Sequence, residues 1–542
     1  MISQALQLVA AFVAARYVYR KFTQISLADL QGPPSKSWLA GNIIDLFADS
    51  TGMLGARWQS VYGTVMKLNP QIFTENAILV TDPAALHYIF QGEGSASRFI
   101  RAPEWYAMAD LLAGQCIGAV EGEVHKRHRK GIRPAFGVPE TRALLPVFNA
   151  IAQKLCEKWE GIIALERGDS AVLNVSEWIS KAALDTFGEV AFDYQFGGLD
   201  EKPTPLSQAM PTVLLETFGT TSAAQLVLLS ILQYVPLSLI RYVLNDAPIT
   251  GILPGIGYVR NTNKESERIL RELIVDRRKM MSEGDKKKDI MGHILRAGLS
   301  EDPTSKLTDY EIVSELRFLL LAGQETSANT LTWALWELAK YPEIQTKLRE
   351  EIAEARSNKA GKDFTTQDLQ AMPLLNAVIK ETLRFTPVVQ NMFRENLVDD
   401  VLPLSSPITL KSGRSVKELP IPKGTKIYCN VTGYNMNPAL WGEDAHVFNP
   451  QRWLNQDNES SNTLGMYANL MTFSAGAKGC IGWRFAVMQL QNLLSELIEK
   501  FEFALPEKGP KVVRANCMAT QPMIEGQYEK GPQLPLVVRR AA

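Results

Sequence analysis

The chain has 542 residues, of which 46% are hydrophobic and 21% are charged, and its formal net charge is −1. This composition indicates a globular protein with an extensive core, excludes a disordered chain and gives no indication of nucleic-acid binding. The cysteines lack the spacing of a disulfide framework and form no C-x-x-C pair, which argues against a disulfide-rich secreted protein and a structural zinc site. They are Cys116, Cys156, Cys429, Cys480 and Cys517.

The N-terminal segment differs in composition from the rest of the chain. Residues 1–15 carry no charged side chain, and Arg16, Arg20 and Lys21 follow. This stretch is short for a hydrocarbon layer of about 30 Å, but Arg16 can extend the span by reaching toward the interface. Because the basic cluster follows the apolar run, we expect a membrane anchor over residues 1–21, with the body of the protein in the cytosol. A cleaved signal peptide, the alternative, would carry a basic residue before the apolar run.

Two further segments are predicted after the anchor. Residues 22–45 form a polar linker and a proline-rich hinge, since "GPPSKSWLAGN" at 32–42 is typical of a stiff, turn-rich connection. Residues 46–542 contain no long linker, internal repeat or low-complexity tract. We therefore expect them to form one large domain.

The fold class expected for this domain is mainly α with small β-sheets. Short β-rich runs occur at 63–69 and 76–83, and again near the end of the chain at 501–505 and 535–540. Between them, apolar residues recur mostly at helical spacing. A run rich in Pro, Ser and Lys, from about 396 to 425, predicts a loop.

The run over 217–240 contains no charged side chain. Its length would allow a second membrane span, but Pro236 and several Gln and Ser positions weaken that interpretation. A pair of core helices is the alternative.

A long helix is predicted over residues 308–340. Thr308-x-x-Glu311 has the pattern of a capping box, and Tyr341-Pro342 marks the end. A helix of this length would measure about 50 Å, enough to cross the whole domain.

The middle of this helix carries "AGQET", residues 322–326. Gly323 costs about 1 kcal/mol relative to alanine, so we expect a reason for it in packing or function, such as a flat ligand lying against Ala322 and Gly323. The Thr326 hydroxyl can donate and accept hydrogen bonds, and the neighbouring Glu325 is an acid in an apolar surround. Together they could relay protons. The alternative is a threonine that bonds back to a carbonyl of its own helix.

Three charged residues further along form a candidate scaffold. Glu381 and Arg384 share a helix face and can pair, and Arg452 could complete a buried triad. An exposed surface pair is the alternative.

A lone cysteine is then crowded by glycines. Gly476, Gly479 and Gly482 surround Cys480, and an apolar helix is predicted from Trp483 onward. Glycine lets a large partner approach the backbone, and the unpaired N–H groups of a helix start favour a thiolate. The pattern predicts a charged sulfur with a bulky partner, and a lone thiolate is a known ligand of haem iron. A buried structural cysteine is the alternative.

This loop resembles the haem-binding loop of the cytochrome P450 family. The matching residues are Phe473, Gly476, Cys480 and Gly482, and Lys478 stands where the family usually has arginine. The resemblance implies that Cys480 ligates the iron of haem b, that these loop residues contact the cofactor, and that Lys478 pairs with a propionate.

The same resemblance extends to the other motifs. The stretch at 322–326 is similar to the family's oxygen-activating motif, which implies that Thr326 and Glu325 deliver protons to the oxygen. Glu381, Arg384 and Arg452 match its structural triad, which would hold the fold behind the haem.

Further cofactor contacts are implied in two other places. Arg394 and Arg129 match propionate-binding arginines of the family, and His125 stands where many members have tryptophan. The basic run at 126–133 would face an acidic reductase. The uncharged run at 217–240 would lie over the substrate entrance, partly in the membrane surface.

The resemblance implies the cytochrome P450 fold, with haem between the long central helix and the cysteine loop, and a membrane-anchored monooxygenase of the endoplasmic reticulum. Its partners would be the membrane and NADPH-cytochrome P450 reductase, which supplies electrons from NADPH through flavins, with cytochrome b5 as a second donor. The substrate would be hydrophobic, such as a terpenoid, a fatty acid or a polycyclic aromatic. "AFDYQFGGLD" at 191–200 is similar to fungal, basidiomycete members, which suggests secondary metabolism.

Two alternatives remain open from the sequence. One is a haem-thiolate isomerase or dehydratase that uses a peroxide, and the other is a non-catalytic haem sensor. Reductase-dependent dioxygen uptake would separate them.

Overall fold

The computed structural model describes residues 25–69, 76–166, 168–200, 254–285, 289–454, 464–517 and 519–541, with a few single positions between 202 and 242. The predicted anchor over 1–21 and, apart from such single positions, the uncharged run over 217–240 lie outside the described residues. Within the described ranges, no helix has the length and apolar character that crossing a membrane requires.

The described part of the chain is mainly helical. Its α-helices are α2 (Ile43–Ala48), α3 (Leu54–Tyr62), α4 (Pro83–Gln91), α5 (Ser95–Arg98), α6 (Pro103–Ala113), α7 (Gly122–Ile132), α8 (Val138–Arg142), α9 (Leu145–Leu165), α10 (Val175–Phe192), α15 (Pro254–Ser282), α16 (Ile290–Gly298), α17 (Asp309–Lys340), α18 (Pro342–Asn358), α19 (Thr366–Ala371), α20 (Pro373–Phe385), α21 (Val431–Asn435), α22 (Pro438–Trp441) and α23 (Trp483–Lys500). Short 3-10 turns are η1 (Arg133–Phe136), η3 (Pro450–Trp453), η4 (Met471–Phe473), η5 (Gly476–Lys478) and η6 (Tyr528–Lys530).

The strands form four small sheets. They are β1 (Val65–Leu68), β2 (Ala77–Val80), β3 (Phe99–Arg101), β4 (Ser170–Asn174), β5 (Asn391–Asn396), β6 (Asp400–Thr409), β7 (Ser415–Ile421), β8 (Lys426–Asn430), β9 (Phe501–Ala504), β10 (Val512–Cys517), β11 (Ala519–Ile524) and β12 (Pro535–Arg540). The largest sheet has the order β1-β2-β8-β5-β3, and the others are β4-β12-β9, β10-β11 and β6-β7. The predicted fold class, mainly α with small sheets, is confirmed.

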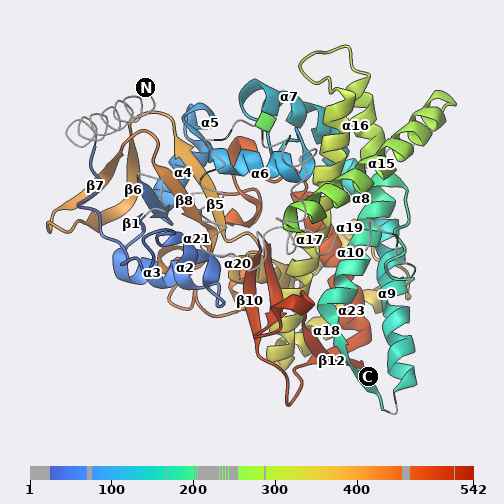
Figure 1. Cartoon of the computed structure of the whole chain (residues 1–542). Helices are drawn as coiled ribbons and strands as arrows, with labels where there is room; N and C mark the ends of the chain where they lie inside the picture. Colours follow the sequence, from blue (N-terminus) through green and yellow to red (C-terminus); the bar gives the residue numbers. More distant parts are fainter. Residues whose placement is uncertain are drawn as a thin grey trace.

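The five-stranded sheet and the β6–β7 hairpin lie at one side of the molecule, and most helices lie at the other (Figure 1). The sheet is antiparallel except for the parallel pair β2–β8. In this sheet β3 pairs with β5 so that Arg101 lies directly opposite Arg394. The register therefore brings together two arginines almost 300 residues apart, which becomes important at the site below.

Helix α17 runs through the centre of the helical part, and the helix predicted over 308–340 is confirmed. The Thr308 hydroxyl accepts a hydrogen bond from the Glu311 N–H at 3.3 Å, and the Glu311 carboxylate accepts one from the Thr308 N–H at 2.8 Å. This reciprocal capping box satisfies two of the N–H groups left free at a helix start. Helices α10, α15, α16, α18, α20 and α23 and strand β11 pack around α17.

Part of the predicted hinge packs into the body. Leu27 and Leu30 are buried in the same apolar cluster as Val65 and Ile421. The Gln31 carbonyl also accepts a hydrogen bond from the N–H of Lys67 in β1. These contacts attach residues 27–31 to the sheet.

The loop predicted from about 396 to 425 is wrong, because most of this stretch forms the β6–β7 hairpin. Leu402 and Leu404 of β6 are buried while the neighbouring Pro403 is only partly so, which is the alternation of a half-buried strand. Pro403, Pro407 and Pro420 concealed the pattern, since proline is accommodated in a strand mainly at an edge or a bulge. The hairpin register shifts between Pro403 and Ile408.

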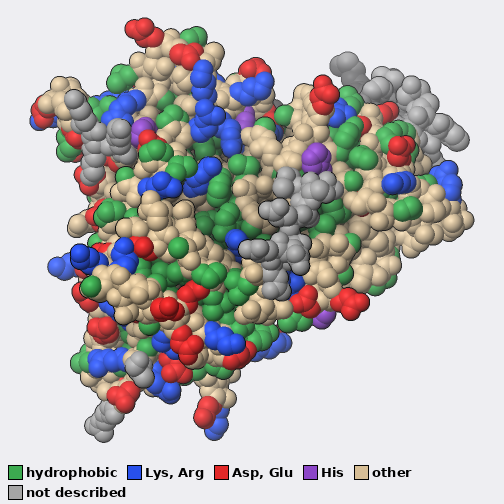
Figure 2. All heavy atoms as spheres, turned by 180° about the vertical axis from the view of Figure 1, so that it is seen from behind, with side chains coloured by type: hydrophobic (Ala, Val, Ile, Leu, Met, Phe, Trp, Pro, Cys, Tyr) green, Lys and Arg blue, Asp and Glu red, His purple; other side chains and the backbone are tan. Residues whose placement is uncertain are grey.

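The surface carries both signs of charge. On the face that Figure 2 shows, Lys and Arg side chains are interspersed with Asp and Glu side chains. This face has no extended basic patch of the kind that nucleic-acid binding requires.

Candidate active site

Cys480 lies in a loop that its own backbone holds in shape. The Cys480 N–H donates to the Phe473 carbonyl at 2.8 Å, and the Gly479 N–H donates to the Gly476 carbonyl at 3.0 Å. Helix α23 begins at Trp483. The loop therefore places the sulfur just ahead of a helix N-terminus, as the sequence predicted.

The glycines of the loop have different structural reasons. Gly476 has φ +64°, and a Cβ there would lie 1.9 Å from the backbone carbonyl oxygen of Phe90 in α4. The close approach at Gly476 is thus made by the protein itself, a reason that the sequence prediction of a ligand contact did not include. At Gly482 the nearest atom to an added Cβ would be a ring carbon of Phe136 at 3.8 Å, so this position leaves room.

The environment of the Cys480 thiol is mixed. Burial raises its pKa, while a hydrogen bond from the Gly482 backbone and the charge of Arg129 lower it. The net effect in the protein alone is a raised pKa, and the expectation of a thiolate stays a prediction. A coordinated metal ion deprotonates a thiol outright, and ligation would therefore supply the missing driving force.

Five groups that can carry positive charge gather around this loop. They come from separate elements: Arg101 from β3, His125 and Arg129 from α7, Arg394 from β5 and Lys478 from η5. The charge of Arg101 influences the pKa of each of the other four. Sequence reasoning did not single out Arg101, and only the pairing of β3 with β5 places it here.

The hydrogen bonds of the three arginines go to backbone carbonyls. Arg129 donates to the Gly479 carbonyl at 2.8 Å, and Arg394 donates to the Phe393 carbonyl at 2.9 Å. Arg101 donates to the carbonyls of Ile117 and Gly118 at 3.2 Å and 2.9 Å. Burial is the main reason why the pKa of each arginine is lowered.

Glu121 is the carboxylate that faces this cluster in the described part of the chain. It accepts a hydrogen bond from the Arg101 N–H at 3.1 Å, and its side chain contacts the ammonium of Lys478. Burial and Arg101 lower the pKa of Lys478, and burial raises the pKa of Glu121. One carboxylate cannot neutralise this many buried cations, so the cluster favours an anionic partner. The pairing of Lys478 with a propionate stays a prediction.

His125 is buried beside these arginines. Burial and the charges of Arg101 and Arg129 lower its pKa to about 4. It is therefore neutral at pH 7, with one N–H to donate. This state is compatible with the hydrogen bond predicted for it.

The basic run at 126–133 is largely paired within the protein. Lys126 pairs with Glu123, and Lys130 contacts Asp302 at 2.8 Å. Arg127 binds Glu311 of α17. These pairs reduce the positive charge of the run, and the expectation that it faces an acidic reductase stays a prediction.

The side chains of Glu325 and Thr326 in α17 form hydrogen bonds with different partners. The Thr326 hydroxyl donates to the Ala322 carbonyl at 2.8 Å, which is the helix-internal bond considered as the alternative. The Glu325 carboxyl is buried, and its Oε2 accepts a hydrogen bond from Nε2 of Gln521 at 3.2 Å. Oε1 of Glu325 has no hydrogen-bond partner among the described residues. Gln521 was missed from the sequence, since it lies in β11.

One face of α17, which we call the half-open face, is only partly covered by other residues. Phe318, Ala322 and Thr326 follow each other at a spacing of four residues, and all three are only half-buried. Neighbouring positions such as Leu320 and Glu325 are buried. Because α17 lies within a shell of other elements, this face borders space that the side chains of the described residues do not fill.

Gly323 has a packing reason that the sequence did not indicate. A Cβ at Gly323 would lie 2.3 Å from the ring of Phe187 in α10. The ring of a neighbouring helix therefore occupies the side of Gly323 where a side chain would stand. Gly323 is itself half-buried, as Ala322 is, and the contact of a flat ligand with both residues stays a prediction. Ala322 remains on the half-open face.

Glu325 is expected to make the stability of the enzyme depend on pH. Burial raises its pKa from 4.5 to about 8, so the unfolded chain releases this proton at a lower pH than the folded one. As pH rises from about 4.5 to about 8, the free energy of unfolding should fall by about 1.4 kcal/mol per unit relative to Glu325→Gln. Thermal melts of both proteins at pH 5.5, 7 and 8.5 would measure this widening gap.

The exposed Glu350 on α18 provides the control. Glu350→Gln makes the same exchange of a carboxyl for an amide at the surface and serves as the matched reference for the melts of Glu325→Gln. A constant difference between Glu325→Gln and wild type would contradict the prediction.

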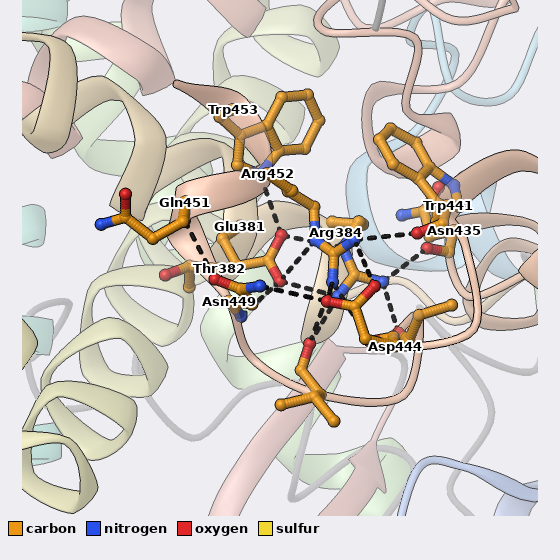
Figure 3. A network of polar contacts seen from close by, with 12 residues as sticks. Glu381, Thr382, Arg384, Asn435, Trp441, Asp444, Asn449, Gln451, Arg452 and Trp453 are labelled. Carbon is orange, nitrogen blue, oxygen red and sulfur yellow. Dashed lines mark hydrogen bonds and ion pairs between the residues drawn. The ribbon is translucent and has the colours of Figure 1, made fainter. Parts of the chain in front are cut away.

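Glu381, Arg384 and Arg452 are brought together as predicted (Figure 3). Arg384 donates to both Glu381 oxygens, at 2.8 Å and 2.7 Å, and Nε of Arg452 donates to Oε1 at 3.2 Å. Trp453 and the Asn449 N–H also donate to this carboxylate, each at 2.8 Å. The carboxylate is fully buried and fully hydrogen-bonded, so an exposed surface pair is excluded.

Comparison with known proteins decides the family. The Cytochrome P450 family matches residues 31–524. The chain belongs to the cytochrome P450 family. A relative, cytochrome P450 monooxygenase 205 of Postia placenta, is 31% identical over 519 residues, which cover 95% of this chain and 93% of the relative.

Other fungal relatives agree. Cytochrome P450 monooxygenase claQ of Ampulloclitocybe clavipes is 30% identical over 94% of this chain and 93% of its own length. Ganoderic acid synthetase CYP5150L8 of Ganoderma lucidum is 30% identical over 92% of each chain. This chain is accordingly a cytochrome P450 monooxygenase of the fungal type, as the motifs indicated.

The residues present fit the haem that the family carries. Cys480 is only partly buried. The cations around it outnumber Glu121, the carboxylate that faces them in the described part of the chain, so two further carboxylates would supply the missing negative charge. The half-buried face of α17 borders the same region, since the ring of Phe318 lies against Gly118, whose carbonyl accepts a hydrogen bond from Arg101. A sulfur ligand for the iron, positive groups for the propionates and unfilled space beside α17 are thus all present in one region.

Proposed function

We propose that this enzyme is a membrane-anchored haem-thiolate monooxygenase that inserts one oxygen atom of dioxygen into a hydrophobic substrate, with electrons from NADPH-cytochrome P450 reductase. The observation that carries the proposal is the joint arrangement of Cys480, the cation cluster around it and the half-open face of α17. The predicted anchor over 1–21 supports a place in the endoplasmic reticulum membrane, with residues 46–542 in the cytosol.

Cys480 would ligate the haem iron, and Arg129, Arg394, Lys478 and Arg101 would hold its propionates. When bound, haem supplies the activation of dioxygen, which a thiolate ligand promotes by donating electron density. The protein residues bind and orient the substrate and exclude water. Thr326 and Glu325 hold and pass protons at their hydroxyl and carboxyl oxygens.

An apolar wall beside α17 supports a hydrophobic substrate. Met108 and Leu112 of α6 cluster with Ala519 of β11, and Leu321 of α17 packs against this cluster. Trp105 and Tyr258 also contact it. The similarity to a relative named ganoderic acid synthetase supports a substrate from fungal secondary metabolism.

Dioxygen uptake tests the proposed function. The full-length enzyme in vesicles with the reductase should consume dioxygen only when NADPH is added, and a library of apolar compounds should accelerate this uptake. An enzyme that ignores NADPH but converts a hydroperoxide would instead be the isomerase alternative. A protein that binds haem but shows neither activity would be the non-catalytic haem sensor.

Thr326→Ala is expected to uncouple the enzyme. Removing a positioned hydroxyl leaves haem binding intact but impairs proton transfer, so more hydrogen peroxide and less product should form per NADPH consumed. Loss of a proton donor typically lowers a rate by about 10²–10⁴-fold, and Thr326→Ser should retain most of the coupling. The measurement is the ratio of product formed to NADPH oxidised.

Thr332 provides a matched control for this experiment. Its hydroxyl makes the same helix-internal bond, to the Ala328 carbonyl at 2.8 Å, but it is buried away from the half-open face. Thr332→Ala should therefore keep the ratio of wild type. Equal ratios in wild type and Thr326→Ala would show that Thr326 serves packing alone.

A further inference from the structure

The partner of Glu325 comes from a strand far along the chain. Gln521 of β11 donates its amide N–H to Oε2 of Glu325 at 3.2 Å, across 196 positions of sequence. Both side chains are almost completely buried, with 3% of Glu325 and 1% of Gln521 exposed. A neutral amide, not a cation, therefore holds this acid in an apolar surround.

Strand β11 is itself fixed to α17. The indole N–H of Trp333 in α17 donates to the Thr520 carbonyl at 3.1 Å, and the Thr520 N–H donates to the Val388 carbonyl at 2.7 Å. The Gln521 backbone also pairs with Ala515 of β10. These bonds immobilise the strand next to Gln521, so its amide reaches Glu325 from a rigid position.

The contact leaves part of both groups free. Oε1 of Glu325 and Oε1 of Gln521 are buried without a hydrogen-bond partner among the described residues. An amide that binds one carboxyl oxygen fixes the orientation of the group while the other oxygen remains available to hold or release a proton. Such preorganisation makes a proton donor effective, because no reorientation is needed during the reaction.

We propose that Gln521 is the positioning residue for the Glu325 acid, and that its amide fixes the carboxyl from which protons pass toward the half-open face of α17. This inference rests on the proposed function. Gln521 acts through Glu325 and does not itself contact the reacting atoms. It extends the proton-transfer machinery to the β10–β11 hairpin.

The electrostatic surroundings support this assignment. Burial raises the pKa of Glu325 to about 8, and the Gln521 amide is the influence that lowers it. No charged side chain of the described elements packed around α17 contributes, whether from α6, α10, α15, α16, α18, α20, α23, β9 or β11. The amide therefore fixes the orientation of the acid and partly offsets the effect of burial on its pKa.

Gln521→Met tests the proposal, because methionine keeps the volume and removes the donor. The ratio of product to NADPH oxidised should fall several-fold. When this ratio is measured against pH, the pH above which it declines should rise by about 0.5–1 unit, because loss of one neutral hydrogen bond disfavours the charged carboxylate. The pH at which thermal stability stops falling should move upward in the same way, and that measurement does not depend on turnover.

Gln324→Met is the matched control. Gln324 is a buried amide adjacent to Glu325, but it donates to the Ser180 hydroxyl at 2.8 Å. This variant should form as much product per NADPH oxidised as wild type does, and this ratio should decline at the same pH, even where the substitution lowers the melting temperature. In a Glu325→Gln background, Gln521→Met should have no additional effect on coupling, since both changes affect one interaction.

Two outcomes would overturn the inference. The first is a Gln521→Met enzyme whose ratio of product to NADPH oxidised and whose thermal stability depend on pH as in wild type. The second is a Gln521→Met substitution that lowers this ratio as much in the Glu325→Gln background as in wild type. Failure of the proposed function is distinguishable from both, because wild type would then show no reductase-dependent dioxygen uptake.

Discussion

Replacing Cys480 by alanine is expected to abolish the absorption band that reduced, carbon-monoxide-bound enzymes show when a thiolate ligates the iron. Cys480 carries the thiol of the loop ahead of α23, and its backbone N–H already donates to the Phe473 carbonyl. Alanine preserves the loop backbone but removes the ligand and its electron donation. Monooxygenation should fall to background.

The experiment separates ligation from folding. Cys480→Ser should give a similarly folded protein without the thiolate band, because serine keeps the size of the side chain. Cys156→Ala, at a buried cysteine of α9, should keep the band and the activity. A Cys480→Ala enzyme that retained the thiolate band would show that another cysteine is the ligand.

Removal of haem offers a second readout of the same site. The cation cluster of Arg101, Arg129, Arg394 and Lys478 is short of negative charge, so the protein without haem should be the less stable form. Adding haem should therefore raise its melting temperature. In Cys480→Ala this increase should shrink without disappearing, because the propionate contacts remain.

Local patterns explain why some elements were predictable from sequence. Helix α17 was found with almost its true bounds, because Thr308, Glu311 and Pro342 act within a few residues of the helix ends. The Glu381–Arg384 pair was found for the same reason, since one helical turn fixes its geometry. Here sequence neighbours are also spatial neighbours.

Contacts set by tertiary structure were not predictable. Arg101 reaches the site only because β3 pairs with β5, and Gln521 reaches Glu325 only because β11 packs on α17. Gly323 and Gly476 suggested ligand contacts, whereas their closest neighbours are protein groups. A glycine in the sequence indicates that something approaches the backbone, but it does not identify the neighbour.

Breaking the Glu381 network is expected to cause the largest loss of stability. Glu381 and Arg384 are both fully buried, and the carboxylate accepts hydrogen bonds from Arg384, Arg452, Trp453 and the Asn449 backbone. Glu381→Ala would leave Arg384 buried without its carboxylate and would remove one of the two carboxylates that Arg452 contacts, the other being Asp444. Removing one partner of a buried ion pair typically costs about 3–5 kcal/mol, a large part of the 5–15 kcal/mol that stabilises most domains.

The predicted result is a much lower melting temperature and loss of haem on purification. Arg384→Lys should be nearly as damaging, because Arg384 also donates to the carbonyls of Asn435, Ala445 and Val447, and lysine lacks the planar fork needed for all of these bonds. Since α20 carries both Glu381 and Arg384, the damage should extend to the helices packed against it, including α17 and α23.

An exposed pair of the same sequence spacing is the control. Glu265 and Arg268 of α15 form a contact of 2.6 Å near the surface, and Glu265→Ala should leave the melting temperature unchanged because Arg268 is exposed to water and keeps its pair with Glu272. Thermal melts of Glu381→Ala, Arg384→Lys and Glu265→Ala under one condition make the comparison. If Glu381→Ala melted like Glu265→Ala, burial would not be what makes the triad important, and its role as the scaffold of the fold would have to be abandoned.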